Sequence, residues 1–429
     1  MTPGPETKKE KLLSKDYIII MCSSLCVNIY TYAFIATLPP YMLFITGRAF
    51  YAGIITSVYS LTALAVRPAA GVFSDRIGRV KLLISGALIC SAAAFGFAFT
   101  TSVIMLIVLR MISGIGFGLH STCGGAAAAD VLPKSRLAEG IGYFGLYSTV
   151  GQMTAPALAL AIVAGGTAAD YKNLFFFGFF IAGAGMIFAC FLTYERRRRK
   201  SEASAAPASS GPEKPSGNAG VPAGPLPKTI LGFEYAVFKP GVVLLIMFFG
   251  IASILSYITV FAELKGFGNS GLYFTFSALG VLFSRLLLGK VVDKRGADVV
   301  VIPAAAMLAC LISLIPTVNS MTALAALAVP IGISQGALLP TMNQMMFRRC
   351  SPQRRGTASG AYYCAVDLGI VIGSPILGAV ADAADIRFSF WLSSVWILIA
   401  LTVYILFCTD KRYSANLSQN KPSSADSET

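Results

Sequence analysis

The chain has 429 residues, of which 55% are hydrophobic and 13% are charged, and its mean hydropathy is strongly positive. This composition excludes an ordinary soluble domain and predicts a protein embedded in lipid. The formal net charge is +14, which we attribute to membrane topology, so nucleic-acid binding is not expected.

A helix that crosses a bilayer needs roughly 20 consecutive apolar residues. Six such runs lie on each side of a polar middle segment, which predicts an all-α membrane protein with two six-helix halves, at 17–194 and 239–408. Polar tails at 1–16 and 409–429 flank these halves, and the second tail is expected to be disordered. The predicted transmembrane helices are 17–41, 50–72, 80–100, 103–129, 138–164, 174–194, 240–261, 270–289, 298–317, 321–346, 357–381 and 387–408.

The middle segment, 195–238, is rich in Ala, Pro, Ser, Gly and Lys for most of its length and lacks an apolar period. We therefore expect a flexible cytoplasmic linker between the two halves. Its last ten residues, 229–238, are predicted to form a short interfacial helix that leads into the seventh span.

The placement of Lys and Arg predicts the orientation, because short loops rich in these residues stay in the cytoplasm. With both termini inside, 27 of the 34 Lys and Arg residues fall on the cytoplasmic side and four fall outside. The remaining three, Arg67, Arg110 and Arg285, lie within predicted spans. The charge pattern thus favours a multi-pass protein with both termini in the cytoplasm, and we expect it in the plasma membrane.

The chain repeats itself at an offset of 218 residues. In 67–81 and again in 285–296, an arginine lies eight residues before an aspartate and a glycine lies four before it. Spans four and ten also share a pair of glycines four residues apart at this offset, and such pairs let helices approach closely in lipid. The repeated positions are Arg67 and Arg285, Gly71 and Gly289, Asp75 and Asp293, Gly114 and Gly332, and Gly118 and Gly336.

These motifs resemble those of the major facilitator superfamily (MFS), in the branch of drug or metabolite:proton antiporters. The loop Gly71-x3-Asp75-Arg76-x-Gly78-Arg79-x-Lys81 resembles motif A, and Arg110-x3-Gly114-x3-Gly118 resembles motif B. The segment from Gly145 to Pro156 is loosely similar to motif C. The resemblance implies the MFS fold of two pseudo-symmetric halves and transport by alternating access.

In this family motif A forms a conformational latch at the cytoplasmic side. The resemblance implies that Asp75 caps the start of span eleven, near Gly356. Arg76 and Arg79 are expected to pair with Asp130, and Arg136 and Glu139 are expected to do the same for Asp293 in the second half. The alternative is that these charges serve only to set topology. The full candidate latch is Gly71, Asp75, Arg76, Gly78, Arg79, Asp130, Arg136, Glu139, Gly289, Asp293 and Arg295.

Asp367 is the one acid predicted inside the membrane core, about ten residues into span eleven and thus roughly 15 Å from its cytoplasmic end. An ionisable group at this depth usually faces a cavity and serves function. Asp367, which we align with Tyr147 of span five, is our candidate proton carrier or partner of a cationic substrate. The alternative is a neutral, hydrogen-bonded acid that only holds helices together.

Two residues of span four are further candidates for proton coupling. Arg110 resembles the motif B arginine, whose part would be electrostatic, acting on a nearby acid or on an anionic substrate; the alternative is a structural arginine paired with backbone carbonyls. His120, the single histidine, is a candidate proton relay or a simple packed residue. Arg67 and Arg285 are interpreted as structural.

Other polar side chains in the spans are candidates for a central substrate cavity. Together with the Phe-rich spans they suggest an amphipathic organic substrate, bound by aromatic contact and a few hydrogen bonds. The alternative for about half of them is a bridge between helices. These residues are Asn28, Tyr32, Tyr147, Gln152, Tyr257, Gln335 and Asn343.

The sequence lacks a Walker-type phosphate loop, a metal-ligating His/Cys set and a catalytic grouping. We therefore expect no ATP use, no cofactor, no metal and no enzymatic activity, and a monomer in the lipid bilayer. The first span carries no acid, unlike many drug:proton antiporters of this superfamily. The predicted function is proton-coupled efflux of small amphipathic compounds. The alternatives are an importer or uniporter of a sugar or organic acid and, more remotely, a membrane receptor or enzyme.

Overall fold

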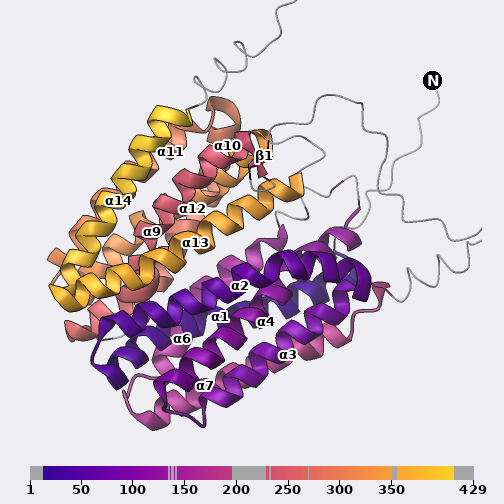
Figure 1. The fold of residues 1–429 in the computed structure, drawn as a ribbon, viewed down its shortest axis with the longest axis horizontal. Helices are drawn as coiled ribbons and strands as arrows, with labels where there is room; N and C mark the ends of the chain where they lie inside the picture. The colour runs from indigo at the N-terminus through magenta and orange to yellow at the C-terminus, as the bar shows by residue number, and fades with distance from the viewer. Residues whose placement is uncertain are drawn as a thin grey trace, which may run out of the picture.

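The computed structural model describes residues 13–133, 136, 140, 143–195, 229–230, 233–268, 270–349 and 355–409. These residues form two helical bundles that lie side by side (Figure 1). The first bundle contains α1 (Lys15–Thr46), α2 (Ala49–Ile77), α3 (Arg79–Phe97), α4 (Val103–Val131), α6 (Leu146–Ile162) and α7 (Ala168–Cys190). The second contains α9 (Tyr235–Leu264), α10 (Gly271–Arg295), α11 (Asp298–Leu314) with the short 3₁₀ helix η2 (Ile315–Thr317), α12 (Met321–Arg349), α13 (Arg355–Ala383) and α14 (Ile386–Phe407).

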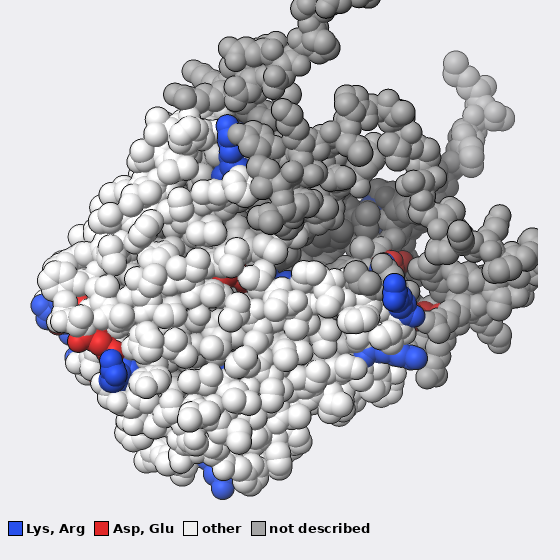
Figure 2. Space-filling view, in the orientation of Figure 1, with Lys and Arg blue, Asp and Glu red and all other residues white. Residues whose placement is uncertain are grey.

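The expected all-α fold with two six-helix halves is confirmed. Ten of the described helices are long and apolar enough to cross a membrane. The other two, α6 and α10, correspond to predicted spans five and eight and contact each other across the two halves. Figure 2 shows that charged side chains are sparse over the body of the visible face and gather mostly toward its two ends.

One predicted element is wrong. Residues 229–238 do not form a single interfacial helix, because β1 (Thr229–Ile230) and β2 (Phe233–Glu234) pair antiparallel and α9 begins directly after them, at Tyr235. The β-branched residues Thr229 and Ile230 favour extended backbone over helix. A ten-residue apolar period was too short to outweigh this preference.

The helix ends define two ends of the molecule. At the distal end, α1 runs into α2 through Gly47, whose φ of 68° suits a residue without a Cβ, and α13 runs into α14 through Asp385, which caps α14. At the proximal end, α2 runs into α3 through Gly78 with a φ of 105°. Side-chain hydrogen bonds from Ser14, Thr167 and Asp385 cap α1, α7 and α14, whereas Arg48 at the start of α2 makes no side-chain capping bond.

The repeated glycines bring neighbouring helices into backbone contact. A Cβ at Gly114 of α4 would lie 2.5 Å from the carbonyl oxygen of Tyr59 on α2, and a Cβ at Gly332 of α12 would collide with the carbonyl oxygen of Ser277 on α10. Tyr59 and Ser277 are themselves 218 residues apart. The duplication therefore preserves the same close helix crossing in both halves, where packing replaces the hydrophobic drive.

Gly114→Ala is expected to destabilise the protein, because the added methyl group meets backbone that cannot move aside easily; overpacking of this kind costs about 1–3 kcal/mol. Gly125→Ala is the matched control on the same helix, since a Cβ there meets nothing within 4 Å. Thermal unfolding of the purified protein in detergent should show a lower Tm for the Gly114 variant alone. Equal Tm values for the two variants would contradict the packing argument.

Candidate functional site

The arginine of the first repeat joins the two halves of the molecule. Arg67 on α2 forms an ion pair with Asp367 on α13, through its Nη1 and the Oδ2 of the carboxylate. The Arg67 guanidinium also lies 4.9 Å from the centre of the Tyr363 ring. The exposed fractions of the two paired side chains are 18% and 9%. Because both side chains are largely sheltered from water, removal of either one would leave the other as an uncompensated buried charge.

The arginine of the second repeat makes the equivalent contact. Arg285 on α10 donates from Nη1 to the hydroxyl of Thr149 on α6, over 2.5 Å. Thr149 and Asp367 are 218 residues apart, as are Arg67 and Arg285. The two contacts are therefore one contact repeated by pseudo-symmetry, and they align Asp367 with Thr149. Our alignment of Asp367 with Tyr147 was wrong by two residues, because sequence alone does not show which residue faces the opposite arginine.

Four tyrosines surround these contacts. Tyr32 of α1 and Tyr362 of α13 lie within electrostatic range of Arg285, and Tyr147 of α6 lies within range of Arg67 and Tyr363. Tyr363 is 47% exposed. We call this group the central site; it comprises Arg67, Arg285, Asp367, Thr149, Tyr32, Tyr147, Tyr362 and Tyr363.

Arg110 lies apart from the central site, inside the first half. It is 1% exposed, its guanidinium stacks 3.9 Å from the centre of the Tyr59 ring, and its Nε and Nη1 have no hydrogen-bond partner among the described residues. The charged or polar groups near it are Tyr59, Tyr30 and Cys90. No acid is among these neighbours, so among the described residues Arg110 has no acid on which to act in the way that the motif B resemblance implies.

His120 also lies away from Asp367, at the contact between α4 and α3. Its Nδ1 is 3.0 Å from the carbonyl oxygen of Leu83, and its Cβ would lie 2.9 Å from a Cβ on Gly86. The ring is 2% exposed. This setting suits a packed histidine, and among the described residues no hydrogen bond links it to the central site.

The other predicted cavity residues fall into two groups. Asn28 on α1 packs against Gly151 on α6, and its Oδ1 is buried with no hydrogen-bond partner among the described residues. Tyr257 on α9 donates to the carbonyl oxygen of Ser374 on α13 over 2.5 Å and also packs against Gly53 on α2 of the other half. Gln152 on α6 and Asn343 on α12 are half-buried, whereas Gln335 on α12 is buried. Only Tyr32 and Tyr147 of the predicted set meet in the central site.

Part of the predicted latch lies at the proximal end, around the connection between α2 and α3. Arg79 forms an ion pair with Asp130, as expected, and also donates to the carbonyl oxygen of Ala126 over 2.9 Å. Arg76 is exposed. Glu195, which we did not predict, accepts the backbone N–H groups of Arg79 and Val80 at 2.5 and 3.2 Å and so caps α3.

The remaining latch candidates are only partly described. Gly71 has open space around it, and Arg136 lies in a turn where its backbone N–H donates to the carbonyl oxygen of Pro133. Glu139 lies outside the described residues, as do the side chains of Asp75, Asp293 and Arg295 and the surroundings of Gly289. The roles that the resemblance assigns to these five residues stay predictions.

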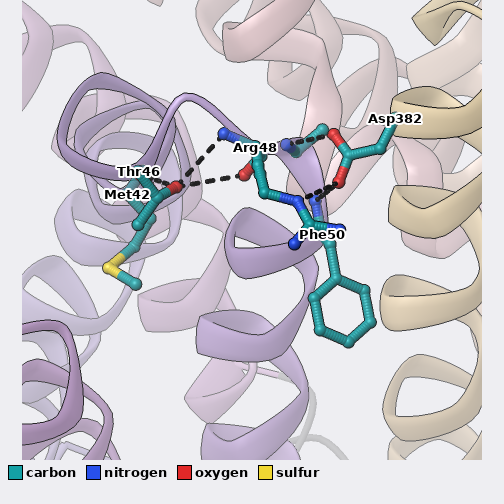
Figure 3. A network of polar contacts seen from close by, with 6 residues as sticks. Met42, Thr46, Arg48, Phe50 and Asp382 are labelled. Carbon is teal, nitrogen blue, oxygen red and sulfur yellow. Dashed lines mark hydrogen bonds and ion pairs between the residues drawn. The ribbon is translucent and has the colours of Figure 1, made fainter.

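A second contact joins the halves at the distal end (Figure 3). Asp382, near the end of α13, accepts the backbone N–H groups of Ala49 and Phe50 at 2.6 and 3.0 Å, and its carboxylate lies 3.7 Å from Arg48 Nε. The carboxylate thus caps α2 from the other half, which compensates for the missing local cap at Arg48. We call this contact the distal clasp.

The comparisons with known proteins agree with the geometry. The sequence model of the family described as the Major Facilitator Superfamily matches residues 20–317 and 270–426 of this chain. The chain belongs to this superfamily. It is therefore a multi-pass membrane transporter that acts on small molecules, and not an enzyme.

The relatives of this chain by sequence include an export protein and a multidrug resistance protein. The staphylopine export protein of Staphylococcus aureus is 22% identical over 82% of this chain and 86% of its own. Multidrug resistance protein 1 of Bacillus subtilis is 24% identical over 82% of this chain and 86% of its own. Among solved structures, the nucleoside transporter NupG aligns with a TM-score of 0.69 at 11% identity, over 92% of this chain and 100% of its own. At that identity the likeness shows the fold alone.

Several functional residues of this MFS transporter were missed at the level of the sequence. They are Arg67 as a link between the halves, Arg285, Thr149, Tyr362 and Tyr363 of the central site, and the capping residues Glu195 and Asp382. A charge inside a span was a usable signal for Arg67, because it needs a partner and Asp367 was the one acid available. The absence of a capping residue at the start of α2 was a weaker signal for Asp382. Nothing local indicates Glu195, which lies 116 residues from the helix it caps.

A double-mutant cycle should measure the coupling of Arg67 and Asp367. Arg67→Ala and Asp367→Ala each leave one sheltered charge without its partner, so each is expected to lower Tm markedly. The double variant should be more stable than the sum of the two losses predicts, with a coupling energy of about 0.5–3 kcal/mol. Thermal unfolding in detergent provides the measurement, and simple additivity would show that the ion pair contributes nothing to the folded protein.

Proposed function

We propose that this protein is a proton-coupled exporter of small amphipathic organic molecules, working by alternating access between its two halves. The observation that carries the proposal is the Arg67–Asp367 ion pair, which links α2 and α13 inside the membrane-spanning region. The similarity to the named exporters supports the direction of transport. Most Lys and Arg residues lie in the loops predicted to be cytoplasmic, and this distribution supports an orientation with the distal end outside.

Asp367 is the member of the pair that carries the proton. Arginine stays protonated in proteins, so it cannot alternate between a protonated and a deprotonated form as a proton carrier must. Protonation of Asp367 removes the negative charge, and Arg67 then loses the partner that offsets the cost of its burial. The link between α2 and α13 weakens as a result, and the two helices become free to separate.

Contacts at the two ends of α2 and α13 would alternate during transport. In the described structure the distal clasp holds the end of α13 against the start of α2. Motif A implies the reverse contact at the proximal end, with Asp75 at the end of α2 capping the start of α13. Each helix would then lend a carboxylate to the start of the other, one contact closing the outside and the other closing the cytoplasmic side.

Asp367→Asn is expected to abolish uphill transport driven by a pH gradient while exchange at equilibrium persists, because the amide keeps the shape of the side chain and cannot titrate. Wild-type proteoliposomes would first be screened with amphipathic organic cations, zwitterions and carboxylates for gradient-driven flux. Driven flux and exchange of the compound selected would then be measured on the same variant preparation.

Asp385→Asn is the matched control, since it makes the same chemical change at a helix cap outside the central site. Gradient-driven accumulation retained by the Asp367 variant would move proton coupling elsewhere. Flux in the same direction as the proton would instead indicate a symporter that imports its substrate.

A further inference from the structure

The central site carries an unbalanced positive charge. Its ionisable groups, apart from the tyrosines, are Arg67, Arg285 and Asp367. Asp367 neutralises Arg67. Arg285 instead faces the neutral hydroxyl of Thr149, and among the described residues it forms no ion pair. The duplication has thus kept both arginines while placing an acid opposite only one of them.

Arg285 lies at the contact between the two halves. Its guanidinium reaches α6 of the other half, and it lies within electrostatic range of Tyr32 on α1 and Tyr362 on α13. The residue is nonetheless exposed. Of its three guanidinium nitrogens only Nη1 has a hydrogen-bond partner among the described residues, so N–H groups remain for a ligand.

We propose that Arg285 binds a carboxylate of the transported molecule. The substrate is then an amphipathic carboxylate, anionic or zwitterionic, and this inference names the substrate class of the function proposed above and rests on it. A guanidinium fits a carboxylate through two parallel hydrogen bonds. The hydroxyls of Tyr32 and Tyr362 can donate to the same group, and the rings of Tyr147 and Tyr363 offer surface for the apolar part.

An organic cation suits the site less well. It would meet two guanidinium groups, and the one carboxylate available to attract it is already paired with Arg67. A carboxylate, in contrast, supplies the charge that Arg285 lacks, and it can replace Thr149 as the partner of the guanidinium without breaking the Arg67–Asp367 pair. The charge of the site therefore selects against cations before any shape is considered.

The test compares three probes of one shape: cyclohexanecarboxylate, cyclohexylmethanol and cyclohexylmethylammonium. A ligand that binds the folded protein raises its Tm in a saturable way, so thermal unfolding of the purified wild-type protein in detergent gives each affinity. We expect a shift with the carboxylate alone. Sodium chloride and inorganic phosphate at equal ionic strength test whether any anion suffices, and a phosphate shift as large as that of the carboxylate would contradict a site for carboxylates.

Arg285→Gln should weaken carboxylate binding about tenfold or more, because a charge-assisted bidentate bond is lost. Arg285→Lys should retain part of the affinity, which guards against a Gln variant that folds poorly. Arg387→Gln is the matched control, at an exposed arginine of the distal end that pairs with Asp385; it should bind like wild type. Unchanged affinity in both Arg285 variants, an equal shift with the alcohol or the ammonium, or no shift with the carboxylate would overturn the proposal.

The test of carboxylate binding at Arg285 and the test of proton coupling at Asp367 can fail independently. Carboxylate binding through Arg285 together with gradient-driven flux in the Asp367→Asn variant would leave this site standing and remove the proposed proton coupling. Driven flux of organic cations that Asp367→Asn abolishes, without carboxylate binding, would do the reverse.

Discussion

The interaction on which the rest of this structure depends is the ion pair between Arg67 and Asp367. A lone charge within a membrane costs several kcal/mol unless it is paired or reaches water, so each residue constrains where the other can lie. Because one stands on α2 and the other on α13, the pair sets how the two halves meet. The same charge that determines the packing can be cancelled by one proton, which makes it a natural point of control.

The internal duplication explains why a second arginine lies across the same interface. The repeat gave both halves an arginine at the same level, and the fold brought each against the helix of the other half that corresponds to span five or eleven. The difference between Asp367 and Thr149 then separates two tasks. In the mechanism that we propose, the pair with Asp367 responds to protons, whereas the contact of Arg285 with Thr149 leaves a cation available to a ligand.

Much of the fold could be predicted from the sequence, because membrane helices must satisfy their own backbone and therefore appear as long apolar runs. The Arg79–Asp130 pair followed from a motif whose residues lie on neighbouring segments of one half. Contacts between the halves could not be predicted in the same way. The partner of Arg67, the register of Thr149 and the capping of α2 by Asp382 all depend on how two bundles dock, which no local pattern encodes.

The most direct test of this account is to measure, as a function of pH, the distance between the two halves at the distal end of the molecule. Spin labels would be attached at Phe44 on α1 and Phe388 on α14, both exposed, in a chain whose nine native cysteines have been replaced, and the distance would be measured by pulsed electron paramagnetic resonance. The account predicts that acidification shifts the distribution toward longer distances in the wild-type background, as the Arg67–Asp367 pair and then the distal clasp open. In the Asp367→Asn background the distribution should not depend on pH. An identical pH response in both backgrounds would contradict the claim that this ion pair controls the movement of the halves.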